Sequence, residues 1–181
     1  MAEHLLYTVA IILIIGIFYT KLTGMTYHWW IILLGSIIAD LDHFNNFFWD
    51  AGILPYEVEV IPYIHLGNFH NIFWLVIVSV IVAGILTYKN IDFSNGLILC
   101  GIGYGIHLFE DFLVYPPVYT MLYPFSNTPV GLNLIPETKN LLWAGTEVLM
   151  VGISFLVIAI IMYAVSTMFC ITNIPNVKEE E

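Results

Sequence analysis

The sequence predicts an all-α protein, a polytopic transmembrane bundle of about five helices with long polar loops at one membrane face. Of the 181 residues, 60% are hydrophobic and only 10% are charged, and the mean hydropathy is +0.89. These values lie far outside the usual composition of a soluble domain. The apolar residues also form long runs, and histidines and aspartates gather where several of these runs end.

A helix that crosses a bilayer core needs about 20 apolar residues, and five stretches are candidates for this role. They cover residues 5–20, 27–49, 71–88, 94–112 and 141–169. The second stretch is the least regular, because Asp40, Asp42 and His43 fall in its last third. It either ends near Asp40 or breaks there and re-enters, and we count it as spanning.

The whole chain, residues 1–181, is expected to form one integral membrane domain that ends in a solvated tail, residues 170–181. The two long connections, 50–70 and 113–140, carry seven of the eight prolines, as expected where a helix cannot continue. No positively charged segment precedes the first apolar stretch. We therefore expect that stretch to be retained rather than cleaved as a signal peptide.

The charged residues exclude some functions and orient the chain. Fourteen acidic residues stand against four lysines and no arginine, so no basic surface is available for nucleic acid or for anionic lipid headgroups. Three of the four lysines fall on one side of the predicted membrane and Lys139 on the other. Because lysine favours the cytoplasmic side, we expect a multi-pass plasma-membrane protein with its long loops outside.

The two cysteines, Cys100 and Cys170, both lie inside apolar runs. A thiol in such a run usually packs as a small hydrophobe. We therefore expect neither a disulfide framework nor a cysteine-bound metal.

His107 and Asp111 stand four residues apart at the end of the fourth apolar stretch. A helix would place their imidazole and carboxylate side by side, and ionisable groups at membrane depth are costly enough to suggest a function. By itself the pair is equally consistent with a hydrogen bond between helices. The neighbouring Gly101 and Gly105 have the spacing of a close helix contact.

Counting the membrane crossings brings more polar side chains to the same face. The residues that share this layer are His4, Asp40, Asp42, His43, His65, His70, His107 and Asp111. His28 falls at the opposite interface, where an ordinary surface histidine is the simpler explanation. Glu110 and Glu147 lie near the shared layer, and the sequence leaves their roles open.

Imidazole nitrogens and carboxylate oxygens are the ligands of zinc and of other borderline divalent metals. The predicted ligands of one or two divalent ions, with zinc foremost, are His4, Asp40, His43, His65, His70, His107 and Asp111. We assign Asp42 a catalytic role as a bridging or orienting carboxylate. Metals of this kind activate water, and a pair of them suits displacement at a phosphodiester.

The order of the motifs adds a family resemblance. The motifs are His4, then Ile37-Ile-Ala-Asp40-Leu-Asp42-His43, His65-Leu-Gly67-Asn-Phe-His70, Gly103-Tyr-Gly-Ile-His107-Leu-Phe-Glu-Asp111 and Pro124-Phe125. Over residues 1–126 the chain resembles the YdjM-like family of membrane-bound metal-dependent hydrolases, which is distantly similar to zinc-dependent phospholipase C and P1-type nucleases. The resemblance implies hydrolysis of an ester or phosphoester by metal-activated water, with membrane lipid and a lipid or small-molecule substrate as partners.

Four positions depart from the family pattern. Ala39 stands where the family has proline, and Leu66, Phe69 and Asn71 replace an arginine, a threonine and a serine. Leucine cannot hold a phosphate as arginine does. One alternative is therefore a metal-binding sensor or carrier without catalysis. Another is a structural membrane protein whose polar groups only hold helices together and bind no metal.

Overall fold

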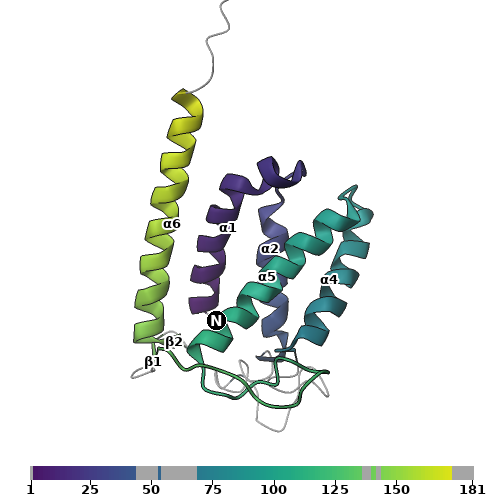
Figure 1. The fold of residues 1–181 in the computed structure, drawn as a ribbon, viewed down its shortest axis with the longest axis vertical. Helices are drawn as coiled ribbons and strands as arrows, with labels where there is room; N and C mark the ends of the chain where they lie inside the picture. The colour runs from purple at the N-terminus through teal and green to yellow at the C-terminus, as the bar shows by residue number, and fades with distance from the viewer. Residues whose placement is uncertain (1, 44–52, 54–68, 136–139, 142–143, 173–181) are drawn as a thin grey trace, which may run out of the picture.

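The computed structural model describes residues 2–43, 53, 69–135, 140–141 and 144–172 (Figure 1). Its elements are α1 (Ala2–Thr23), α2 (Trp29–Ala39), the 3₁₀ turn η1 (Asp40–His43), α4 (Ile72–Thr87), α5 (Phe93–Val114), β1 (Asn140–Leu141), β2 (Ala144–Gly145) and α6 (Thr146–Thr172). The two strands have two residues each and pair antiparallel. The predicted all-α membrane bundle is confirmed.

Three helices in the described ranges contain segments long and apolar enough to cross a membrane. These segments are His4–Thr23 in α1, Phe93–Val114 in α5 and Glu147–Met168 in α6. Helices α2 and α4 have 11 and 16 residues. At a rise of about 1.5 Å per residue they are shorter than the hydrocarbon core, which is about 30 Å thick.

Local sequence explains where several helices begin and end. Helix α1 ends at Thr23 and is followed by Gly24, whose φ of 70° favours glycine. Asn71 caps α4 by accepting a hydrogen bond from the Trp74 amide at 3.1 Å, and Asp92 caps α5 in the same way. Helix α2 ends at Ala39, one of the two alternatives that the sequence allowed. The rest of that apolar stretch, residues 44–49, lies outside the described residues.

Helix α5 packs against α2 and α4, while α1 packs against α6 and α2 (Figure 1). The start of α1, the turn η1, the start of α4 and the end of α5 all lie at one end of the bundle, at the bottom of Figure 1. The loop that follows α5 runs beneath them. This end collects the polar residues of four elements.

Helices α2 and α5 cross with their backbones in direct contact. A Cβ atom at Gly103 would overlap the carbonyl of Ile32, and a Cβ at Gly35 would overlap the backbone of α5. The spacing of Gly101 and Gly105 predicted a close helix contact. A Cβ atom added at either position would lie 3.6 Å from a side chain of α4, which is an ordinary contact distance. The close approach of α2 and α5 therefore occurs at Gly103, which lies one turn before His107 on α5.

At the other end of the bundle a polar contact joins three segments. The hydroxyl of Tyr19 donates to Oδ1 of Asn95 at 2.7 Å, and Nδ2 of Asn95 donates to the carbonyl of Thr26 at 2.9 Å. Between the two ends lies an apolar core that includes Ile31 and Cys100. Cys100 is a buried free thiol, as predicted.

Candidate metal centre

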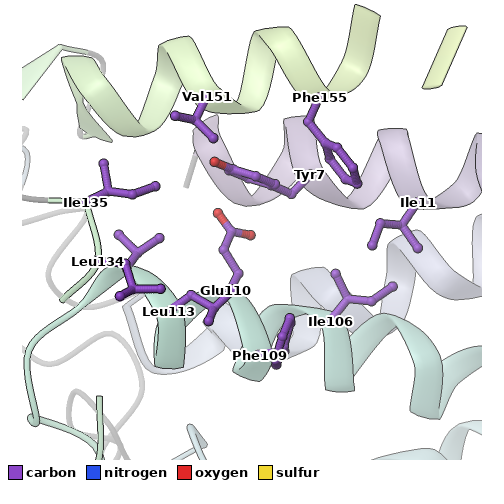
Figure 2. A pocket seen from close by; sticks show the side chains of 11 residues that line it. Tyr7, Ile11, Ile106, Phe109, Glu110, Leu113, Leu134, Ile135, Val151 and Phe155 are labelled. Carbon is purple, nitrogen blue, oxygen red and sulfur yellow. The ribbon is translucent and has the colours of Figure 1, made fainter. Parts of the chain in front are cut away.

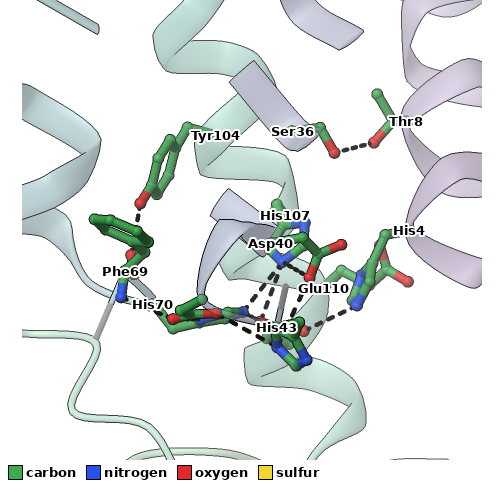
Figure 3. A network of polar contacts seen from close by, with 12 residues as sticks. His4, Thr8, Ser36, Asp40, His43, Phe69, His70, Tyr104, His107 and Glu110 are labelled. Atoms are coloured by element: carbon green, nitrogen blue, oxygen red, sulfur yellow. Dashed lines mark hydrogen bonds and ion pairs between the residues drawn. The ribbon is translucent and has the colours of Figure 1, made fainter. Parts of the chain in front are cut away.

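Eight ionisable side chains meet at the lower end of the bundle (Figure 3). This cluster consists of His4, Asp40, Asp42, His43, His70, His107, Glu110 and Asp111. All are buried except His43, whose side chain is 28% exposed. Six of the seven predicted ligands and Asp42 are therefore brought together, whereas His65 lies outside the described residues.

The ends of α2 and α5 decide which side chains face the cluster. Along α5, the four-residue spacing sets Nε2 of His107 3.5 Å from Oδ2 of Asp111. After Ala39 the chain tightens into the 3₁₀ turn. This turn buries both Asp40 and Asp42. An uninterrupted α-helix would have directed Asp42 away from Asp40 and His43.

Three ligand atoms form a nearly regular triangle. The Nε2 atoms of His70 and His107 are 3.3 Å apart, and Oδ2 of Asp111 lies 3.2 Å from the first and 3.5 Å from the second. Two ligands held about 2.0–2.1 Å from one ion at tetrahedral angles are about 3.3 Å apart. The triangle therefore has the dimensions of one face of a tetrahedral zinc-like site.

Neighbouring residues hold His70 in the orientation that such a site requires. Oδ2 of Asp42 lies 2.9 Å from Nδ1 of His70 and accepts the backbone amide of Phe69 at 2.8 Å. The hydroxyl of Tyr104 donates to the Phe69 carbonyl at 2.6 Å, and the ring of Tyr119 stacks on His70. A proton on Nδ1 leaves the lone pair of Nε2 free for a metal.

A carboxylate also faces the Nδ1 atom of His4, as Asp42 does at His70. Its Nδ1 lies 3.0 Å from Oε2 of Glu110, and its Nε2 lies 3.5 Å from Oδ1 of Asp111. The two oxygens of Asp111 thus face different histidines, His4 on one side and His70 on the other. This is the arrangement of a carboxylate that bridges two positions.

Asp40 provides a second point of convergence. Its Oδ1 lies 3.5 Å from Nε2 of His107 and 3.8 Å from Nε2 of His43. Among the described residues, three groups have ligand atoms within 4.8 Å of one another and could hold an ion. They are His4 with Asp40 and His107, Asp40 with His43 and His70, and His70 with His107 and Asp111. Asp40, His70 and His107 each belong to two of these groups, so the cluster could hold one ion or two.

Two histidines outside the membrane-spanning segments have shifted pKa values. Burial lowers the pKa of His43 despite the neighbouring Asp40. Burial also acts to lower the pKa of His70, but the hydrogen bond with Asp42 and the charge of Asp111 together outweigh it and raise the pKa. His43 is therefore more readily neutral than an ordinary histidine, and His70 less so.

Four aspartate oxygens of the cluster lack hydrogen-bond donors. Oδ1 of Asp40, Oδ1 of Asp42 and both oxygens of Asp111 are buried and have no such partner in the part of the chain that the structure describes. Histidine nitrogens lie 3.2–3.8 Å from these oxygens, but no hydrogen bond joins them. Lys21 and Lys89 are exposed near the opposite end. Buried charges need compensation, and a divalent cation fits this donor set.

A cavity of about 180 Å³ reaches the cluster from between α1 and α2. It is lined by His4, Leu5, Leu33, Ser36, Ile37 and Asp40. Beside it, the hydroxyls of Thr8 and Ser36 share a hydrogen bond of 2.8 Å. Water or a small reactive group could therefore approach His4 and Asp40 through this cavity.

Glu110 is the member of the cluster that sequence reasoning did not assign. It follows His107 by three residues, a helical spacing that already indicated a shared face, but its partner His4 lies far away in the sequence. Glu147, the other acidic residue left open, belongs to none of the three ligand groups. His28 lies at the opposite end of α2, as predicted.

The family comparison covers both the cluster and the last helix. The family model described as YdjM inner membrane protein matches residues 1–174 of the chain. The match extends the predicted resemblance, which covered residues 1–126, through α6. No curated protein and no solved structure matches the chain. The likeness to phospholipase C and P1-type nucleases stays a prediction. Because the match covers nearly the whole chain, the protein belongs to the YdjM inner membrane protein family.

Proposed function

We propose that this protein is a membrane-embedded hydrolase that uses one or two divalent ions, zinc foremost, to cleave an ester or phosphoester of a lipid or envelope component. The observation that carries the proposal is the triangle of His70, His107 and Asp111, with edges of 3.2–3.5 Å, set among buried aspartate oxygens that lack hydrogen-bond donors. The distribution of the lysines supports placing the metal centre at the outer face of the membrane.

His70, His107 and Asp111 would hold one ion, and Asp40 with His4 or His43 would complete a second position. Bound there, a divalent cation supplies Lewis acidity and lowers the pKa of a water molecule. Asp111 presents an oxygen to each side of the cluster, which suits a bridging role. Nitrogen and oxygen ligands at tetrahedral spacing favour zinc over magnesium or calcium.

The remaining acidic residues orient the ligands and handle protons. Asp42 holds Nδ1 of His70, and Glu110 holds Nδ1 of His4. Asp42 keeps Oδ1 available to take the proton of the attacking water. In hydrolysis the water oxygen bonds to the acyl carbon or phosphorus, the bond to the alcohol oxygen breaks, and that proton passes to the alcohol.

Metal analysis of the detergent-purified protein tests this proposal. Wild type is expected to contain about one or two ions per chain, and a double variant, His107→Ala with Asp111→Ala, to lose them. His28→Ala removes a histidine at the opposite end of the bundle and should keep the metal. Absence of metal from wild type, or the same metal content in the double variant, would refute the metal centre. Chelator-sensitive cleavage of chromogenic carboxylic and phosphoric esters then tests hydrolysis.

A second candidate function is metal binding without catalysis. It is favoured by the absence of arginine from the chain and by the exposed, distant positions of Lys21 and Lys89. No described basic side chain is therefore available to hold an anionic phosphate. A protein that keeps its metal but cleaves neither class of ester would support this function over hydrolysis.

A further inference from the structure

A second and larger cavity, of about 310 Å³, lies between α1, α5 and α6 (Figure 2). It is lined by Tyr7, Ile11, Ile106, Phe109, Glu110, Leu113, Val114, Leu134, Ile135, Val151 and Phe155. Protein interiors contain few voids much larger than a water molecule. A space of this size is at the lower end of the range for small-molecule sites.

The lining of this cavity favours a hydrocarbon occupant. Each of the three helices around it contains a candidate membrane span, so the cavity lies among segments at bilayer depth. Its side chains are aliphatic or aromatic except for the carboxylate of Glu110 and the hydroxyl of Tyr7 (Figure 2). That hydroxyl donates to the Val148 carbonyl at 3.4 Å. The walls thus offer little to a polar ligand.

Glu110 connects the cavity to the cluster. Glu110 lines one end of the cavity, and its Oε2 is 3.0 Å from Nδ1 of His4. Nε2 of His4 in turn lies 3.5 Å from Asp111. One end of the cavity is therefore separated from a proposed metal ligand by a single side chain.

We infer that this cavity binds one acyl chain of an amphiphilic lipid substrate and places the ester or phosphoester of that lipid beside Glu110 and His4. The inference rests on the proposed function, because it identifies the substrate of that site as a lipid. The volume suits one hydrocarbon chain and not a whole diacyl lipid. The Glu110 end of the cavity is the end nearest the cluster, so the acyl chain extends away from Glu110 and the headgroup lies toward the cluster.

Photolabelling of the full-length protein in detergent tests the inference. The probe is a lysophospholipid with a photoactivatable diazirine at the end of its single acyl chain, and adducts are mapped by mass spectrometry. Because the diazirine is at the chain end far from the headgroup, saturable adducts are expected on lining residues away from Glu110 on all three helices, such as Ile11, Ile106 and Phe155 (Figure 2). Val151→Trp fills the cavity and should reduce these adducts at least about tenfold.

Ile153→Trp is the matched control, because Ile153 is exposed at nearly the same depth of α6 and does not line the cavity. It should leave the adducts unchanged. Adducts spread evenly over the exposed face of α6, or equal labelling of the two tryptophan variants, would overturn the inference. Metal content is measured on the same samples. Retained metal without cavity labelling refutes the lipid site alone, whereas cavity labelling of a metal-free wild type refutes the proposed function alone.

Discussion

The Nε2 atoms of His70 and His107 face each other across 3.3 Å, and one oxygen of Asp111 lies within 3.5 Å of both. Two imidazoles at this distance either share a proton or share an ion. Asp42 already occupies the other nitrogen of His70, so a shared cation explains why all three ligand atoms point inward.

Asp42→Asn is expected to weaken metal binding about 10–100-fold, because the amide no longer favours the tautomer of His70 that leaves Nε2 free. Competition with a chromogenic chelator measures the affinity. Asp92→Asn is the matched control, since asparagine also caps a helix and Asp92 caps α5 at its other end. Equal affinities of wild type and Asp42→Asn would show that Asp42 does not orient His70.

Removal of the metal by a chelator is expected to lower the thermal stability in detergent. The buried carboxylates of Asp40 and Asp111 would then lose the ion that compensates them. An ion present at 100 times its dissociation constant contributes about 2.7 kcal/mol. Thermal unfolding followed by tryptophan fluorescence measures the change. The double variant, His107→Ala with Asp111→Ala, should show no chelator effect, and a shift of similar size there would contradict the assignment.

Metal affinity is expected to fall as the pH decreases. The raised pKa of His70 means that the metal-free protein holds a proton that the ion must displace. Affinity is therefore complete above this pKa, which is higher than that of an ordinary histidine, and is lost as the pH falls through it. Burial lowers the pKa of His43, so His43 takes up a proton only at lower pH and adds little to this loss. Asp42→Asn removes the hydrogen bond that raises the pKa, so the loss should move to lower pH. Titrations at several pH values would contradict this if the two proteins lost metal at the same pH.

Gly103→Ala is expected to destabilise the protein by about 1–3 kcal/mol, because a methyl group has no room against the backbone of Ile32. It should also weaken metal binding, since His107 follows one turn later on α5. Gly84→Ala is the matched control, because a Cβ there meets nothing within 4 Å. Thermal unfolding of both variants measures the difference. Equal stability would mean that α2 and α5 tolerate a wider separation than the structure has.

Much of this protein follows from local pattern and from the membrane. The apolar stretches predict helices because a bilayer requires the backbone to satisfy its own hydrogen bonds. The spacing of His107 and Asp111 places them together because a helix repeats every 3.6 residues. Crossing counts place His4, Asp40 and His70 at the same end for a topological reason that needs no knowledge of packing.

Sequence alone therefore determined the membrane class, the helices and the layer that holds the polar residues. Tertiary structure decided the inward turn of Asp42, the pairing of Glu110 with His4 and the contact at Gly103. It also decided the cavity between α1, α5 and α6, which no motif predicts. The reason is physical: distances between residues far apart in the chain depend on how side chains pack between helices, and helix periodicity carries no information about that packing.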